Sequence, residues 1–180
     1  RTIDAIDQTG EHKGQVMPVL PRLVEHISIL LWLERGDWAL LDRWLAAQEP
    51  IMPVAGDEDS LYNEYEGMHQ LSLARVWIAK GRKEGGPSLF DQAFQLLSQI
   101  ERPARRSRCV HALVEIHLLQ ALVLYELEKR GTGTAEKSLD YFSHSLELGL
   151  PAGYKRIYLE EGAPVAELLR AWLRSSLAQA

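Results

Sequence analysis

Apolar residues recur at the three- and four-residue spacing of an α-helix along almost the whole chain of 180 residues. Glycine and proline interrupt this spacing at intervals, and the helical segments between the interruptions alternate between long and short. Hardly any segment has the two-residue alternation of a strand. The sequence therefore predicts an all-α fold of about eight helices, with residues 1–20 as an irregular segment. The expected helices lie within residues 22–36, 37–45, 61–80, 88–103, 106–130, 134–149, 154–161 and 164–173.

Three glycines, Gly36, Gly81 and Gly131, each follow a long helical segment and are predicted to end it. They are spaced more widely than the roughly 34 residues of a TPR repeat, so the helices and loops are longer than in that repeat. A helix pair cannot bury its apolar face alone, and stacking successive pairs gives them a common core. We therefore expect one domain over residues 1–180, a TPR-like right-handed superhelix of stacked antiparallel helix pairs. The segment 106–130 is apolar nearly all round, which suits a central helix.

Short polar residues stand at the expected starts of three helices, namely Asp37, Ser60 and Ser88. The first backbone N–H groups of a helix have no partners within the helix, and side-chain oxygens of these residue types accept hydrogen bonds from them. The three residues are therefore predicted to be N-caps.

The composition limits the class of protein. Apolar residues make up 46% and charged residues 25%, and the net charge of −5 opposes direct contact with nucleic acid, which needs an excess of Lys and Arg. No run reaches the roughly eighteen uninterrupted apolar residues of a membrane span, and no signal peptide follows Arg1. The single Cys109 excludes an internal disulfide. We expect a cytoplasmic segment of a longer protein that contacts neither nucleic acid nor membrane.

Side chains that carry chemistry are scattered along the chain. None of the six histidines forms an H-E-x-x-H pair, and His111 and His117 face different sides of one helix, so they cannot chelate one metal ion. Cys109 lies among apolar residues that favour a buried, unreactive thiol. Neither a G-x-S-x-G elbow nor a phosphate-binding G-x-x-x-x-G-K-[ST] loop is present. We predict no metal site, no cofactor and no catalytic activity.

Polar residues interrupt the long apolar segment at His111, Glu115 and Gln120. Burying such groups without partners costs free energy, so they need either a groove or internal hydrogen bonds. The first helix of each pair lines the concave face of a TPR-like stack, and Gln70 and Arg75 lie on the preceding first helix. We expect these five residues to line a groove that binds a peptide or a small molecule. The alternative is a set of internal hydrogen bonds that fix the register of the helices.

Four arginines cluster at the expected start of the long apolar helix: Arg102, Arg105, Arg106 and Arg108. Positive charge at a helix start opposes the helix dipole, so a compensating anion is expected there. The cluster predicts an anion patch formed by the arginines and free backbone N–H groups. The alternative, which the ease of arginine pairing favours, is a solvated face balanced by carboxylates of a neighbouring helix such as Glu84 or Glu101.

Two segments resemble one bacterial family. Residues 33–45, LERGDWALLDRWL, resemble the hairpin of MalT-like regulators that begins L-x-x-G-D and ends W-L. Residues 153–165, GYKRIYLEEGAPV, followed by two leucines, resemble the G-x-x-R-x-F-x-D-E-G-x-P-M segment that closes the TPR-like region of that family. The departures are Tyr158 for Phe, Glu160 for Asp and Val165 for Met, and none of them alters the helical prediction.

The resemblance implies the sensor arm of a large LuxR-type transcription activator, in which an ATPase module precedes the TPR-like region and a helix-turn-helix that binds DNA follows it. The expected function is to bind a small-molecule inducer or a protein or peptide partner and to pass the effect to those parts by a population shift. A stand-alone TPR adaptor that binds a partner peptide is the alternative. Apolar faces at the ends of an isolated stack also predict self-association.

Overall fold

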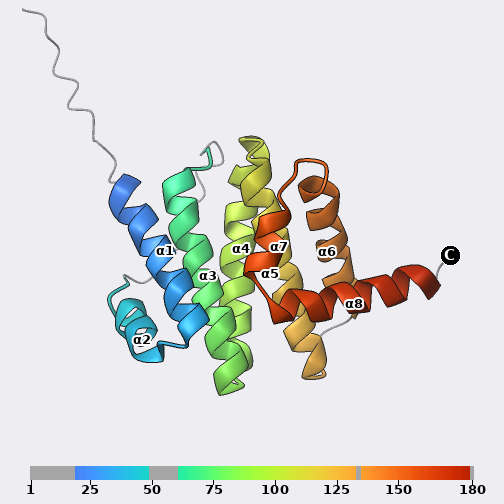
Figure 1. Ribbon diagram of the computed structural model, residues 1–180, viewed down its shortest axis with the longest axis horizontal. Helices are drawn as coiled ribbons and strands as arrows, with labels where there is room; N and C mark the ends of the chain where they lie inside the picture. The colour runs from blue at the N-terminus through green and yellow to red at the C-terminus, as the bar shows by residue number, and fades with distance from the viewer. Residues whose placement is uncertain (1–18, 49–60, 133–134, 179–180) are drawn as a thin grey trace, which may run out of the picture.

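The computed structural model describes residues 19–48, 61–132 and 135–178, and all regular secondary structure within these ranges is helical. Most of the helices stand side by side, and the last one lies across its neighbours at one end of the row (Figure 1). The predicted all-α fold is confirmed. The helices are α1 (Val19–Arg35), α2 (Trp38–Ala46), α3 (Glu64–Glu84), α4 (Pro87–Arg106), α5 (Val110–Lys129), α6 (Ala135–Gly149), α7 (Lys155–Glu160) and α8 (Ala163–Ala178).

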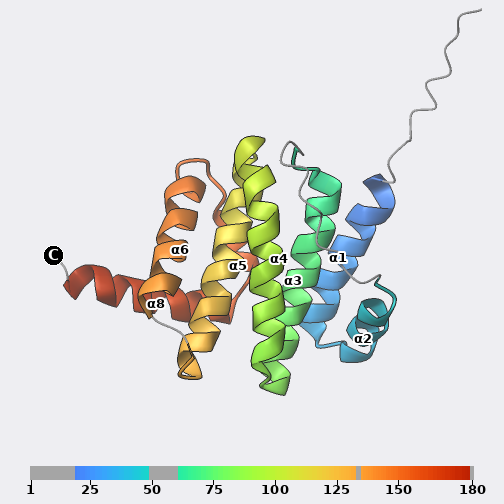
Figure 2. The ribbon, with the colours of Figure 1, turned by 180° about the vertical axis from the view of Figure 1, so that it is seen from behind.

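The helices form two layers. The front layer, turned toward the viewer in Figure 1, consists of α1, α3, α5 and α7, and the reverse view in Figure 2 shows α2, α4 and α6 on the other side. The pairs α3–α4 and α5–α6 are antiparallel neighbours, as predicted for a TPR-like stack. The last pair departs from this pattern, because α7 has only six residues and α8 packs across α5 and α6.

The hydrophobic core forms around α5, which α3, α4 and α6 contact. Ile116, Leu118 and Leu122 on this helix are fully buried. The expectation of a central helix is therefore confirmed. This helix is long and apolar enough to cross a membrane, but most of its apolar stretch is buried inside the fold, as in the core helix of a soluble domain.

The end of α3 is set by packing as well as by local sequence. Gly81, predicted to end the helix, lies inside it and is buried. A Cβ atom at this position would lie 2.9 Å from the ring of Phe90, so glycine allows α3 and α4 to approach closely. Gly85 ends the helix instead, with the positive φ of 78° that glycine adopts without strain.

Helix starts also differ in part from the prediction. The side chain of Asn63 caps α3 by accepting hydrogen bonds from two backbone N–H groups, while Ser60 lies outside the described residues. Asp37 occupies the N-cap position of α2, but its side chain makes no capping hydrogen bond. Ser88 lies within α4 and not at its start, because Pro87 takes the first helical position, where its missing N–H costs nothing.

The boundary between α4 and α5 lies later than predicted. Proline removes one helical hydrogen bond, and the sequence therefore predicts an end near Pro103. In the structure α4 continues to Arg106, because the buried Ile100 and Ala104 hold its last turns against the core. The chain then turns through Arg108, whose φ is 53°, and α5 begins at Val110.

The short helix α7 is attached to its neighbours by hydrogen bonds and by apolar packing. The hydroxyl of Tyr158 donates to the backbone oxygen of Ser145 on α6 at 2.7 Å. The hydroxyl of Ser145 in turn donates to the backbone oxygen of Val114 on α5 at 2.9 Å. Ile157 is the buried apolar residue of α7. This helix thus lies over the front of α5, held by these hydrogen bonds and by the packing of Ile157 and Tyr158 against the core.

Candidate functional site

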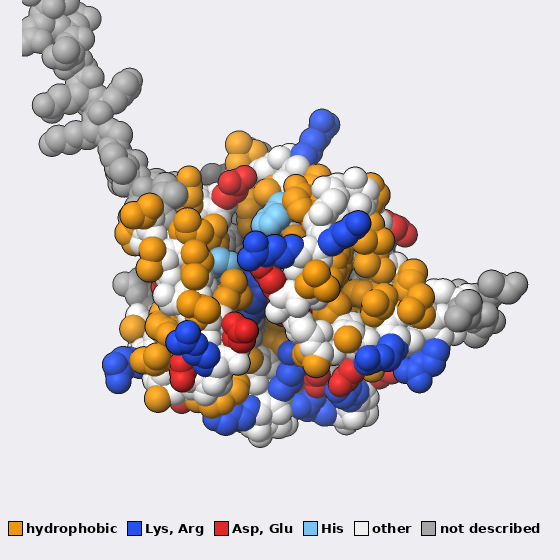
Figure 3. All heavy atoms as spheres, in the orientation of Figure 1, with side chains coloured by type: hydrophobic (Ala, Val, Ile, Leu, Met, Phe, Trp, Pro, Cys, Tyr) orange, Lys and Arg blue, Asp and Glu red, His pale blue; other side chains and the backbone are white. Residues whose placement is uncertain are grey.

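The front layer carries a hollow in which polar side chains gather. Figure 3 shows this face hollowed between α3 and α7, with acidic, basic and histidine side chains in the hollow and hydrophobic side chains on both sides. We call this region the central hollow, and we define it by His26, Arg75, His111, Glu115 and Glu161. These residues come from α1, α3, α5 and the end of α7. Segments far apart in the sequence therefore form one polar surface.

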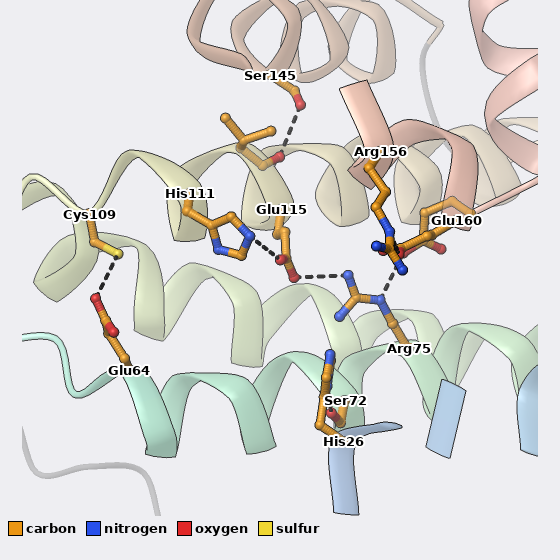
Figure 4. Close-up of polar contacts among 12 residues, drawn as sticks. His26, Glu64, Ser72, Arg75, Cys109, His111, Glu115, Ser145, Arg156 and Glu160 are labelled. Atoms are coloured by element: carbon orange, nitrogen blue, oxygen red, sulfur yellow. Dashed lines mark hydrogen bonds and ion pairs between the residues drawn. The ribbon is translucent and has the colours of Figure 1, made fainter. Parts of the chain in front are cut away.

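Arg75 lies at the centre of this group, with only 9% of its side chain exposed. Its Nη2 atom donates to Oε2 of Glu115 on α5 at 2.9 Å, and its Nε atom donates to Oε1 of Glu161 at 2.7 Å. Figure 4 shows the guanidinium directed from α3 toward Glu115. One buried cation thus joins three elements of the front layer.

Arg75 and Glu115 hold each other in the ionised state. Burial alone would raise the pKa of Glu115, but the positive charge and hydrogen bond of Arg75 outweigh it and lower the pKa. Burial likewise opposes the charged form of Arg75, and the attraction of Glu115 and Glu161 raises its pKa nonetheless. His26 has a lowered pKa because of its burial and the nearby charge of Arg75. The neutral form of His26 is therefore favoured at neutral pH.

Two histidines border the ion pairs. His111 lies one turn before Glu115 on α5, and its Nε2 atom is 3.3 Å from Oε1 of that carboxylate. Its side chain is 55% exposed, and its ring meets the ring of Tyr154 edge-on. His26 reaches the hollow from α1, with Nδ1 at 2.7 Å from the hydroxyl of Ser72 (Figure 4). Both rings offer the hollow a nitrogen that can donate or accept a hydrogen bond.

The structure brings Arg75, His111 and Glu115 together but separates Gln120 from them. Gln120 is five positions beyond Glu115 on α5, a rotation of roughly 140° about the helix axis. It is fully buried and donates through Nε2 to Oε2 of Glu101 on α4 at 3.1 Å. For Gln120 the alternative of an internal hydrogen bond therefore holds. Gln70 is buried on α3 and takes no part in the ion pairs of Arg75.

Gln120 belongs to a second polar group, which we call the Glu101 cluster: Glu101, Arg105, His117 and Gln120. Nη2 of Arg105 donates to Oε1 of Glu101 at 2.6 Å, and Nε2 of His117 lies 3.3 Å from the same oxygen. The hydrogen bond with His117 is the main reason that the pKa of Glu101 is lowered to about 2; burial opposes it, and Arg105 and Gln120 add to it. This cluster links α4 to α5.

The arginine cluster does not lie where the sequence predicts it. Because α4 extends to Arg106, Arg102, Arg105 and Arg106 occupy the end of α4, and Arg108 lies in the turn before α5. Positive charge at the end of a helix agrees with its dipole, so the argument for a compensating anion no longer holds. Arg105 pairs with Glu101, which lies on the same helix and not on a neighbouring helix as the alternative predicts.

The thiol of Cys109 lies beside a carboxylate. Cys109 was expected to be buried, but it is only partly buried, and its Sγ atom lies 4.0 Å from Oε1 of Glu64 (Figure 4). Its position just before α5, at the edge of the core, explains the difference. Among residues 19–48, 61–132 and 135–178, no group of three or more His, Cys, Asp or Glu residues could hold a metal ion.

Sequence reasoning missed Glu161, His26 and Ser72 as members of the polar surface. Glu161 is 86 positions from Arg75, and the sequence drew attention to it only within the segment that resembles a known family. His26 and Ser72 are 46 positions apart and had no distinguishing pattern. The signal that points to His26 is that a polar residue interrupts the apolar residues of α1, just before Ile27.

The chain matches a model of a known protein family. The model of the MalT-like TPR region matches residues 2–176, which is nearly the entire chain. The chain belongs to this family. No curated protein and no solved structure matches it significantly.

A MalT-like TPR region is a helical-repeat domain that mediates interactions, and such repeats are typically non-catalytic. In this MalT-like TPR region the polar hollow lies on the layer formed by the first helix of each pair. That is the layer on which the sequence predicts a groove. The geometry offers hydrogen-bonding and charged groups from four elements, an arrangement suited to binding.

Proposed function

We propose that this MalT-like TPR region is the ligand-sensing and interaction segment of a bacterial LuxR-type transcriptional regulator, acting in the cytoplasm. The family match over residues 2–176 is the observation that carries the proposal. The segment binds a small-molecule inducer, or a protein or peptide partner, in the central hollow. It passes the effect to ATPase and DNA-binding parts of the parent protein, and it makes no contact with nucleic acid itself.

The ion pairs of Arg75 provide a means of transmission. A ligand that competes for Glu161 weakens one of the links that hold the end of α7 to α3. The Tyr158 hydrogen bond to α6 and the burial of Ile157 also hold this short helix, so the loss of the Glu161 link leaves α7 with fewer interactions. A ligand that binds better to one position of α7 than to another shifts the populations of the two states.

The reading frame around the 180 residues tests the proposal. We expect a phosphate-binding loop of the type G-x-x-x-x-G-K-[ST] upstream and a helix-turn-helix downstream. A frame that encodes neither would contradict the regulator function. A stand-alone TPR adaptor that binds a partner peptide would then be the better account of the same hollow.

A further inference from the structure

The central hollow carries more negative than positive charge. Arg75 supplies one positive charge, and Glu115 and Glu161 supply two negative charges within hydrogen-bond distance of it. His26 is held toward its neutral form. At the rim, Arg156 and Glu160 on α7 pair with each other and cancel (Figure 4). The ion pairs of Arg75 with Glu115 and Glu161 therefore carry one net negative charge.

The hollow also contains a buried donor without an acceptor. Nη1 of Arg75 is shielded from solvent and makes no hydrogen bond, although the other two nitrogen atoms of this guanidinium are paired. Figure 4 shows the guanidinium lying between Glu115 and the His26 ring from α1. A buried charged donor without a partner is costly, so an acceptor supplied from outside the chain gains more here than at an exposed site.

Exposed apolar side chains lie on the helices at either side of the hollow, as Figure 3 shows. On α1 these include Leu23 and Ile27, which are 41% and 48% exposed, and on α7 Leu159 is 77% exposed. A surface with apolar residues on both sides of a charged centre is complementary to a peptide segment that has a charged residue between apolar ones. A free metal ion or a small anion would leave these surfaces unused.

We propose that the central hollow binds a basic side chain of a peptide segment whose neighbouring residues are apolar. The ammonium or guanidinium group lies against Glu161 and Glu115, where it compensates the unbalanced charge. A backbone carbonyl of the same segment accepts a hydrogen bond from Nη1 of Arg75, and the apolar neighbours pack on α1 and α7. An acidic ligand would add to the unbalanced charge, and a neutral one would leave it unpaired. This inference rests on the proposed function only in taking the hollow as the ligand site.

Three capped pentapeptides test the charge requirement with the full 180-residue chain. They are acetyl-Ala-Leu-X-Leu-Ala-amide with lysine, norleucine or glutamate at X, so that only the central side chain changes. Titration calorimetry at low salt should give an affinity for the lysine peptide about tenfold higher than for the norleucine peptide, and weaker binding still of the glutamate peptide. Equal affinities, or preference for glutamate, would overturn the proposal.

Variants at position 161 locate the effect. The variant Glu161→Gln removes the unbalanced charge while keeping the shape of the side chain. The roughly tenfold preference for the lysine peptide should then disappear, and the lysine and norleucine peptides should bind with about equal affinity. The variant Glu161→Asp keeps the charge and should keep most of the preference. Glu167→Gln, on α8, is the matched control and should behave as the wild type, because it pairs with Lys129 away from the hollow. Circular dichroism establishes that each variant is folded.

The outcomes separate this inference from the proposed function. A preference for lysine that persists in Glu161→Gln would overturn the assignment of the basic group to this carboxylate.

Butylamine, which carries the ammonium without a peptide, should bind at least tenfold more weakly than the lysine peptide, and equal affinity would overturn the peptide as the occupant. A charge preference in a chain whose reading frame lacks both regulator modules would uphold this inference and contradict the proposed function. A frame that encodes both modules, together with equal binding of the three peptides, would uphold the proposed function and contradict this inference.

Discussion

The central hollow and the Glu101 cluster lie on different sides of α5, and each contains an arginine and buried polar groups. In the Glu101 cluster one carboxylate accepts from Arg105, His117 and Gln120, so its single negative charge is balanced by the arginine. The groups left without partners there are atoms of an imidazole and an amide. In the central hollow one arginine lies between two carboxylates, and the unpartnered atom belongs to the charged arginine itself.

This difference separates a polar group that stabilises the fold from one that suits a ligand. Both clusters fix the positions of helices, because buried hydrogen bonds are lost if the helices shift. Of these two clusters, the central hollow is the one that leaves a charge and a charged donor for another molecule to satisfy. The balance of charges around a buried site therefore says more about binding than the mere presence of polar residues on a core helix does.

The largest expected effect comes from removing the cation of the central hollow. The variant Arg75→Met leaves Glu115 buried without its partner, and we expect it to lower the free energy of unfolding by about 3–5 kcal/mol. Urea unfolding at pH 7 measures the change. The control is Arg156→Ala on the same face, where an exposed pair should contribute less than about 0.5 kcal/mol. A loss below about 1 kcal/mol for Arg75→Met would contradict the account of this site.

The next effect comes from the Glu101 cluster. The variant Glu101→Ala removes the acceptor for three donors, and we expect a loss of about 2–3 kcal/mol in the same unfolding experiment. Binding of the lysine peptide should not change, because this cluster lies on another side of α5. The exposed Glu136→Ala on α6 is the control and should cost within about 0.5 kcal/mol. Loss of peptide binding in folded Glu101→Ala would remove the distinction between the two clusters.

The pH dependence of stability sharpens the same comparison. The pKa of Glu101 is lowered from 4.5 to about 2, mainly through its hydrogen bond with His117. The ionised carboxylate therefore stabilises the fold fully above the unfolded pKa of 4.5, and this stabilisation is lost as the pH falls toward the folded pKa of about 2. We expect the free energy of unfolding to fall by about 1–2 kcal/mol more in the wild type than in Glu101→Ala between pH 5 and pH 2, after allowance for solvent screening. Parallel pH profiles of the two proteins would show that this carboxylate contributes nothing.

The smallest effect concerns the attachment of α7. The variant Tyr158→Phe removes the hydrogen bond to Ser145, and we expect a loss of about 1 kcal/mol together with faster amide hydrogen exchange in α7. Tyr125→Phe on α5 keeps its ring near Lys129 and serves as the control. Unchanged exchange in α7 would mean that its ion pair with Arg75 and its apolar contacts are enough to hold it.

The sequence by itself determined that the chain is helical and indicated the family. The predicted alternation of long and short helices holds for α1 and α2 but not for α3 and α4, which have 21 and 20 residues, or for α7 and α8, where the short helix comes first. It also indicated Arg75, His111 and Glu115 as residues of one polar face. These properties are local or periodic: three of the five predicted groove residues lie on one helix, and the spacing of apolar residues places that helix in the core. The predicted family rests on two short segments, and the family model now extends the match to residues 2–176.

Tertiary structure alone decided the partners. Arg75 meets Glu115 and Glu161 from 40 and 86 positions away, and no spacing in the sequence encodes such a meeting. Packing against Phe90 keeps Gly81 inside α3, and buried contacts carry α4 past Pro103, so that the arginines lie at a helix end and not at a helix start. Gln120 shares a helix with Glu115 but turns toward α4. The periodicity of a helix fixes which residues share a face, whereas the neighbour that each face meets depends on how the helices pack.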